Sequence, residues 1–250
     1  MTTVRDIYDF LDSIAPFNTL PELADSDRSG LQTGDFAQEV RGAMVSLDVT
    51  PGVIEQAVQT GCDLIVSHHP VLFMARRQLL THDPAWLLAR HGISCIASHI
   101  PLDACAGGVS DTLAALLGLG DIASPDGLVR IGTLPDTMAA EAFAGFAARR
   151  LCARVRYCDA GRPIRRVAVC GGGGCQVLGE MVGRADAFLT GDAARHNFLE
   201  AAQQGLSLFA AGHFETEHPV VPVLAQRLRE AFPAVEWRIA REGDEVRHAP

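Results

Sequence analysis

The sequence contains no lysine. All 21 basic residues are therefore arginines, and 30 acidic residues give the chain a net charge of −9. An acidic chain without basic tracts lacks the clustered cations that hold nucleic acid or an anionic membrane surface, so we expect neither partner. The GxxxxGK[ST] phosphate-binding loop is also excluded, because it requires a lysine.

Long apolar runs and paired cysteines are missing as well. No apolar run approaches the ~20 residues that span a bilayer, and no charged-then-apolar leader opens the chain. The seven cysteines are odd in number and form no CxxC pair, which is typical of free thiols in a reducing compartment. We therefore expect a cytoplasmic protein.

What the sequence does contain is enough apolar surface for a large core. Apolar residues make up 48% of the 250 residues and charged residues 20%. A chain of this length buries roughly 70–75% of its unfolded surface, so it folds without disulfide or metal staples. The composition indicates a globular protein of one large or two smaller domains.

Short apolar runs alternate with segments of helical spacing. Helices are expected near 4–14, 51–61, 84–91, 111–117 and 138–150, and strands near 43–47, 64–66, 93–98, 155–158, 167–170, 187–190, 206–211 and 235–239. This alternation predicts an α/β fold of two α/β domains with mostly parallel sheets. Glycine and proline in 121–135 indicate a hinge, which divides the chain into residues 1–125 and 126–250. The segment 212–250 could pack back on the first domain.

Unusual polar motifs directly follow the expected strands. They are Ser67-His68-His69-Pro70, His99-Ile100-Pro101-Leu102-Asp103, Gly171–Gly174, Thr190-Gly191-Asp192 and Gly212-His213-Phe214-Glu215-Thr216-Glu217. In open α/β sheets, ligands bind beyond the carboxyl ends of the strands. The motifs are therefore expected to converge on one sheet edge, or on two edges that face each other across a cleft.

The chemistry of these motifs points to metal. Adjacent side chains of an extended segment point to opposite sides, so His68 and His69 suit one metal ion each. His213 and Glu217 are spaced i, i+4 and share one face of a helix, while Asp103 adds a second carboxylate. Three imidazoles and two carboxylates suit a pair of divalent Zn, Fe, Mn, Co or Ni ions, whereas calcium prefers oxygen ligands throughout. Each motif alone also has a structural interpretation, as a surface pair or a helix cap.

Other residues leave alternatives open. His99 is a candidate ligand, hydrogen-bond donor to Asp103 or acid–base group. His196 lies four residues after Asp192, so it could protonate a leaving group or pair with that carboxylate. The glycine run 171–174 could bring backbone N–H groups to a phosphate, or it could form a tight strand-to-helix turn.

Several motifs together resemble one known family. DLIVSHHPVLF at 63–73, HIPLDACAGGVSDTLAALLGL at 99–119, SLDVTP at 46–51, ADAFLTGD at 185–192 and GHFETE at 212–217 match in order and spacing. Together they resemble the dinuclear-metal-centre hexameric protein family, which is also called GTP cyclohydrolase 1 type 2 or Nif-three-like. The resemblance covers nearly the whole chain.

The resemblance implies a fold, an assembly and an activity. The family has a metal site in the cleft between two α/β domains and forms a toroidal hexamer. The implied ligands of two divalent transition-metal ions are His68, His69, Asp103, His213 and Glu217. The implied reaction is hydrolytic opening of the guanine ring of GTP, which gives formate and dihydroneopterin triphosphate. His99 or His196 would move protons, and the glycine run or an arginine such as Arg195 would hold the triphosphate.

The chain departs from the family pattern at positions other than the five ligands. WDNxGL reads Ser26-Asp27-Arg28-Ser29-Gly30-Leu31, GGxND reads Gly107-Gly108-Val109-Ser110-Asp111, and the usual glutamate of TGE is Asp192. We expect these departures to affect substrate contacts more than metal binding. Two alternatives fit the same ligands: another dinuclear phosphoesterase acting on nucleotides or other small phosphorylated substrates, and a non-enzymatic hexameric protein that binds metal or a partner.

Overall fold

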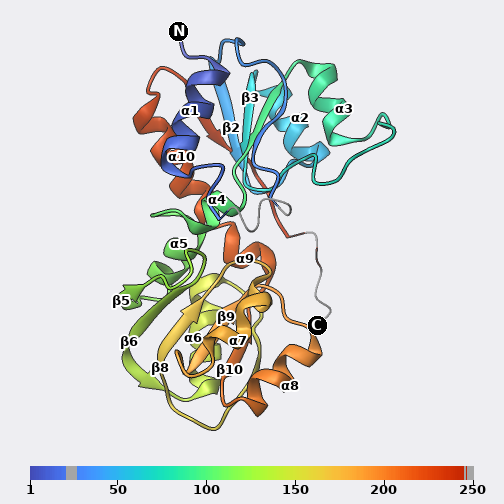
Figure 1. Cartoon of the computed structure of the whole chain (residues 1–250). Coiled ribbons are helices and arrows are strands. Elements are labelled where there is room, and N and C mark those ends of the chain that lie inside the picture. The colour runs from blue at the N-terminus through green and yellow to red at the C-terminus, as the bar shows by residue number, and fades with distance from the viewer. Residues whose placement is uncertain (21–26, 245, 247–250) are drawn as a thin grey trace. The chain divides into compact units, whose positions relative to one another are not determined.

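A computed structural model describes residues 1–20, 27–244 and 246 of the chain (Figure 1). These residues form two compact units. Unit 1 comprises Met1–Ala106 and Val221–Gly243, and unit 2 comprises Gly107–Val220 with the chain from Asp244 onward. Within the described ranges, every helix is too short or too polar to cross a membrane.

Unit 1 is a five-stranded sheet with helices on both faces (Figure 1). The strands, in spatial order, are β1 (Gly30–Thr33), β4 (Ser94–Ala97), β3 (Leu64–Ser67), β2 (Gly42–Ser46) and β11 (Glu236–Ile239). The helices are α1 (Val4–Ile14), α2 (Pro51–Gln59), α3 (Pro84–His91), α4 (Ile100–Ala104) and α10 (Val220–Ala231). Only β1 runs antiparallel to its neighbour, so this sheet is mostly parallel, as predicted.

Local sequence signals set the helix ends of unit 1. The Thr3 side chain accepts from the Asp6 N–H and Asp6 accepts from the Thr3 N–H, which is a capping box at the start of α1. Thr50 caps α2, whose first residue is Pro51. Gly92 ends α3 in the left-handed conformation at φ 65°. These helices therefore begin and end close to where the sequence places them.

Unit 2 is built on a six-stranded mixed sheet. The strands, in spatial order, are β5 (Gly120–Ala123), β6 (Arg130–Met138), β8 (Ile164–Val169), β9 (Ala187–Thr190), β10 (Ser207–Ala210) and β7 (Arg156–Cys158). The helices are α5 (Val109–Leu116), α6 (Ala140–Leu151), the 3₁₀ helix η2 (Gly174–Val177), α7 (Leu178–Met181), α8 (Arg195–Gln203) and α9 (His213–Glu217). Only β8, β9 and β10 pair in parallel.

The structure differs from the sequence interpretation at the expected hinge. Residues 121–135 lie inside unit 2, where β5 and β6 pair as an antiparallel hairpin. All four residues of β5 are exposed, so this strand has no apolar alternation for a pattern to detect. Buried Arg130 holds the hairpin through Asp111, Ser124 and the Gly127 carbonyl. Asp111 of the GGxND-like motif therefore has a structural contact.

The parallel strands bring the polar motifs of each unit to one edge. In unit 1, β2, β3 and β4 are parallel neighbours, and the chain beyond their carboxyl ends carries Asp48, His68 and His99. In unit 2, β8, β9 and β10 lead in the same way to the glycine run, to Asp192 and to His213. The strands themselves are buried almost throughout, so they form a rigid base for these side chains.

Candidate metal centre

Unit 1 gathers three imidazoles at the ends of β3 and β4. One ring nitrogen each of His68, His69 and His99 lie within 4.8 Å of one another, a spacing that could hold a metal ion. The histidine pair is fixed by its backbone, since His68 N donates to Ser46 O at 3.1 Å and His69 N donates to Leu47 O at 2.9 Å. Asp103, on α4, places Oδ1 3.6 Å from His68 Nε2.

Oxygen acceptors orient both rings of the histidine pair. His68 Nδ1 lies 3.0 Å from the Ser98 carbonyl oxygen, which can only accept, so Nδ1 carries a proton. His69 Nδ1 lies 2.8 Å from Asp48 Oδ1, an acceptor that favours a proton on Nδ1 in the same way. A metal-binding histidine typically donates its second ring nitrogen in this way. Both rings therefore have the orientation that a metal ligand requires.

Unit 2 holds a histidine and a glutamate on the short helix α9. Glu217 is buried at 4% exposure, and its Oε2 lies 3.2 Å from His213 Nε2. His213 Nδ1 lies 2.7 Å from Asp192 Oδ2, so this imidazole is oriented as the two in unit 1 are. The hydrogen bond to Glu217 raises the pKa of His213 to about 9, Asp192 acts in the same direction, and burial opposes both.

The glycine run at 171–174 leaves space for the side chains of His213 and Glu217. Gly172 has φ +57°, and a Cβ there would lie 1.9 Å from Glu217 Oε1 and 3.0 Å from His213 Nε2. Its carbonyl oxygen accepts from Gly191 N, Asp192 N and Thr190 Oγ1. The Gly172 N–H donates to Thr216 Oγ1, and the Gly174 N–H donates to Thr190 Oγ1. The run is thus the tight turn, and these two N–H groups are used inside the protein instead of pointing at a phosphate.

His99 has its own carboxylate partner. His99 Nδ1 lies 3.6 Å from Asp27 Oδ1, and the His99 N–H donates to Ser29 Oγ at 2.9 Å. Burial raises the pKa of Asp27, but the neighbouring His99 imidazole and the hydrogen bonds from Ser29 outweigh it and leave this pKa below its usual range. The ring centre of His99 lies 5.2 Å from that of His68. His99 is therefore a positioned imidazole beside the histidine pair.

His196 is placed differently. It lies exposed on α8, and among the described residues no hydrogen bond or ion pair joins it to Asp192. The Asp192 carboxylate is bonded to His213 instead. Asp192, which stands where the family pattern has a glutamate, thus contacts one of the five predicted ligands.

Sequence reasoning missed three carboxylates that orient the imidazoles. Asp48 and Asp192 each follow a buried strand within two residues, so they share the signal that singled out the histidines. Asp27 follows no buried strand, and its match to the aspartate of the WDNxGL pattern does not indicate which imidazole it contacts. The donor set itself fits a divalent ion of the zinc to manganese series, since imidazole nitrogens and carboxylates of oriented residues meet within each unit.

Known proteins are similar to this chain in sequence and in fold. Residues 2–245 match the family described as Duf34/NIF3 (NGG1p interacting factor 3). Proteins named GTP cyclohydrolase 1 type 2 homolog match from Clostridium perfringens, at 29% identity over 96% of both chains, and from Campylobacter jejuni, at 31% identity over 90% of this chain and 92% of that one. The crystal structure of Staphylococcus aureus hypothetical protein SA1388 aligns with a TM-score of 0.89, at 24% identity over 99% of both chains. Protein ybgI, of unknown function, aligns with a TM-score of 0.87, at 24% identity over 98% of this chain and all of that one.

Proposed function

The chain belongs to the Duf34/NIF3 family, and on this premise we propose that it is a metal-dependent hydrolase with a dinuclear centre. The observation that carries the proposal is the orientation of three imidazoles. His68, His69 and His213 each direct Nδ1 to an oxygen, at 3.0, 2.8 and 2.7 Å. A metal-binding histidine almost always donates its second ring nitrogen in this way, and the three imidazoles share this arrangement.

We propose that two divalent transition-metal ions bind per chain, drawn from Zn, Fe, Mn, Co and Ni. Their ligands are His68, His69, Asp103, His213 and Glu217. Bound there, such ions supply Lewis-acid activation of water and substrate. The buried Glu217 and the partly buried Asp103 offset the positive charge of the ions, and the cradle at Gly172 leaves room for the Glu217 carboxylate.

Metal analysis of the purified full-length chain tests this ligand set. We expect close to two ions per chain in the wild type and less than one in either Asp103→Ala or Glu217→Ala. Asp136→Ala, which removes an exposed carboxylate from β6, is the matched control and keeps both ions. Metal content that is unchanged in both ligand variants would refute the site.

The proposed substrate is GTP, opened to formate and dihydroneopterin triphosphate, as the names of the curated relatives suggest. His99 is the favoured proton-transfer residue, because Asp27 and Ser29 hold it beside the histidine pair. His196 is the alternative, and its exposure on α8 gives it no comparable support. His99→Gln should lower kcat by about 10²–10⁴-fold with metal content unchanged.

Formate release from GTP decides the reaction. Formate that is absent from Asp103→Ala and present in the wild type supports the cyclohydrolase. Release of phosphate without formate would identify a phosphoesterase, and metal without turnover of any nucleotide would identify a binding protein.

We also propose a toroidal homohexamer in the cytoplasm. All seven cysteines are thiols and not disulfides, which suits a reducing compartment. Light scattering coupled to size-exclusion chromatography should give a molecular mass six times the 26.7 kDa of one chain. A monomer or dimer at micromolar concentration would refute the hexamer.

A further inference from the structure

A cavity of about 440 Å³ in unit 2 adjoins the candidate metal ligand His213. Two arginines line it, Arg154 and Arg156, together with the aromatic ring of Phe214. Arg156 is the first residue of β7 (Arg156–Cys158), and Arg154 precedes it by two residues. Both arginines therefore line the same cavity as His213.

Arg156 is tied to the strand that leads to His213. Strand β7, which Arg156 begins, pairs with β10, and Arg156 lies opposite Ala210 in the register. Three residues after Ala210 the chain reaches His213. Arg156 Nη2 donates to the Ala193 carbonyl at 2.9 Å, and its guanidinium lies 5.5 Å from the ring centre of Phe198. The pairing of β7 with β10 thus places Arg156 beside the segment that leads to His213.

Three carboxylates also line this cavity, and two of them are bonded to protein donors. Asp192 is bonded to His213, and Asp244 accepts from the Val246 N–H at 2.9 Å. The third, Glu215, lies against Gly212, where a Cβ would come within 2.0 Å of Oε2. The arginines are the permanently charged donors of the cavity, and the planar guanidinium matches the oxygens of a phosphate.

We infer that Arg154 and Arg156 form a phosphate-binding subsite, which anchors the phosphate group of a nucleotide whose reacting end lies beside His213. This inference deepens the proposed function and rests on it for the identity of the nucleotide. It differs from the expectation that the glycine run anchors the phosphate, because the Gly172 and Gly174 N–H groups are bonded within the protein.

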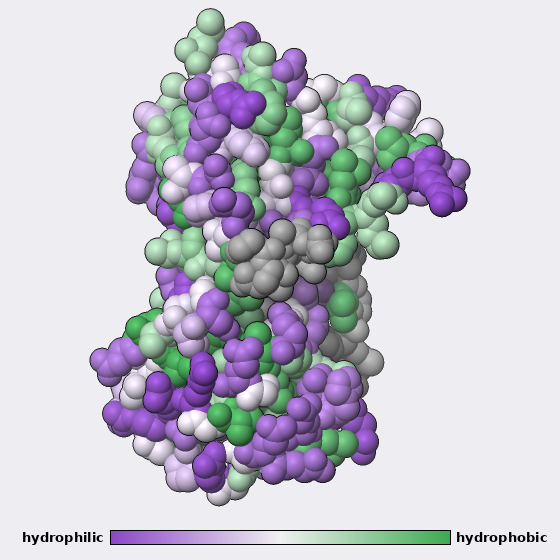
Figure 2. Space-filling model, viewed as in Figure 1, coloured by the Kyte–Doolittle hydropathy of each residue, from purple (hydrophilic) through white to green (hydrophobic). Residues whose placement is uncertain are grey.

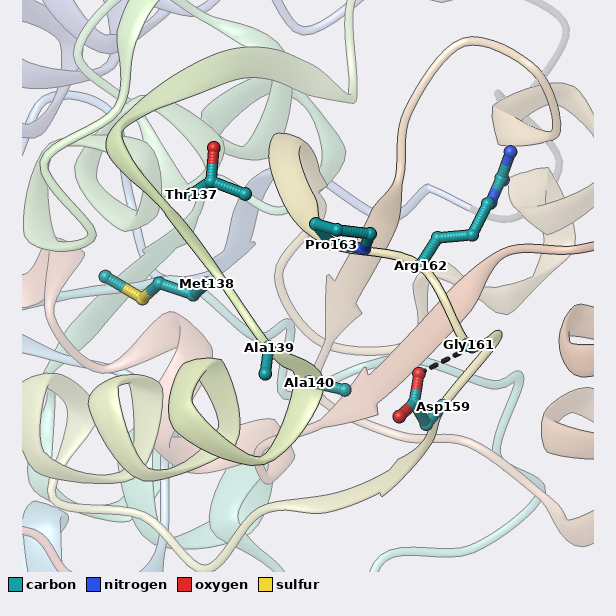
Figure 3. A pocket seen from close by; sticks show the side chains of 8 residues that line it. All are labelled: Thr137, Met138, Ala139, Ala140, Asp159, Gly161, Arg162 and Pro163. Carbon is teal, nitrogen blue, oxygen red and sulfur yellow. Dashed lines mark hydrogen bonds between the residues drawn. The ribbon is translucent and has the colours of Figure 1, made fainter.

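A second cavity of unit 2 provides the matched control (Figure 3). It is lined by Thr137, Met138, Ala139, Ala140, Asp159, Gly161, Arg162 and Pro163. Asp159 accepts from the Gly161 N–H at 2.7 Å, and the Arg162 side chain points away from Asp159 and donates to the Gly205 carbonyl. No polar groups converge there, so Arg162→Gln removes the same charge from the same unit without touching the subsite.

Equilibrium dialysis of the metal-loaded full chain against labelled inorganic phosphate tests the inference. We expect Arg154→Gln and Arg156→Gln each to weaken phosphate binding by about tenfold, since each removes a charge-assisted donor. Arg156→Lys retains the charge and should recover part of the loss, while Arg162→Gln should bind as the wild type does. Equal binding in the double Arg154→Gln/Arg156→Gln variant, or equal loss in Arg162→Gln, would overturn the inference.

Steady-state kinetics separate this inference from the proposed function. The arginine variants should raise the KM for GTP with kcat nearly unchanged. Formate release with an unaltered KM in the arginine variants would refute the subsite and support the cyclohydrolase. Arginine-dependent phosphate binding without any formate release would support the subsite and refute the cyclohydrolase.

Discussion

At the scale of single residues, Gly172 shows how closely the backbone approaches a candidate ligand. A side chain at φ +57° costs about 1–2 kcal/mol by itself, and the new Cβ would displace the Glu217 carboxylate. We expect Gly172→Ala to lower the free energy of unfolding by about 1–3 kcal/mol and to reduce bound metal. Urea unfolding and elemental analysis measure the two effects.

The next residue supplies the control for that substitution. Gly173 has φ −91°, and a Cβ there would have nothing within 4 Å. Gly173→Ala should therefore keep both stability and metal. If Gly172→Ala and Gly173→Ala have the same stability and metal content, the close approach of the Gly172 backbone has no role in holding Glu217.

Cysteine reactivity should follow burial. Complete burial raises the pKa of Cys95 to about 12, so its thiol stays protonated and inaccessible at pH 8. Cys152 is exposed just after α6. Under native conditions we expect iodoacetamide to modify Cys152 early and to leave Cys95 intact until the protein unfolds. Peptide mass analysis checks this order, and early modification of Cys95 would contradict the buried strand.

At the scale of the element, the capping box of α1 gives a pH-dependent contribution to stability. The Thr3 N–H, with the Thr3 hydroxyl, holds the pKa of Asp6 below its ordinary value of 3.8. A lowered carboxyl pKa stabilises the fold above the unfolded pKa, and that contribution is lost as pH falls through the lower folded pKa. Asp6→Asn should therefore flatten the stability profile below about pH 4, as followed by thermal unfolding across pH.

Thr3→Ala removes the other half of the same box. It should lower the free energy of unfolding by about 1 kcal/mol at neutral pH. Thr2→Ala, one residue outside the box, should change it little. If the stability of the wild type and that of Asp6→Asn decreased equally as the pH falls below about 4, the capping box would not form.

The elements differ in how well the sequence predicts them. Strands such as β3 and β9, buried along their whole length, appear as short apolar runs between turn signals. The exposed β5 has no such run, and β6 carries a bulge between Thr133 and Met138, so their hairpin resembled a linker. Capping residues predicted helix ends well, because a cap acts within four residues. Strand order and pairing depend on contacts far apart in sequence, which no local pattern contains.

The candidate site follows the same rule. Spacing and position after strands were enough to single out His68, His69, Asp103, His213 and Glu217, and the family resemblance is confirmed over residues 2–245. The oxygens that orient the rings were not predicted. Asp27 contacts His99 across a long stretch of chain. Only the folded backbone shows which carboxylate reaches which imidazole.

At the scale of the whole molecule, each unit has its own core (Figure 1). On the face shown in Figure 2, hydrophilic residues cover most of unit 2, and its apolar residues occur in small separate groups. The two sheets bury their apolar strands independently. A substitution in the core of one unit should therefore weaken that unit first.

Trp237 on β11 tests this independence. It is buried at 7% exposure, and its indole N–H donates to the Phe232 carbonyl at 3.2 Å. Trp237→Ala should cost unit 1 about 3–5 kcal/mol. Amide exchange should rise in β2, β3 and β4 and stay unchanged in β8, β9 and β10. Ile239→Ala, at a residue of the same strand that is 37% exposed, is the control with little effect. A uniform rise across both units would mean that they unfold together.

The discontinuity of unit 1 has a consequence for synthesis. The first segment of unit 1 leaves the ribosome before any of unit 2, but β11 follows only after Val220. Until then β2 is an edge strand, since β11 is its neighbour on that side. Almost all of unit 2 can thus fold while the sheet of unit 1 still lacks β11 and has β2 as an unpaired edge. Such an edge is where a nascent chain most readily mispairs with another copy.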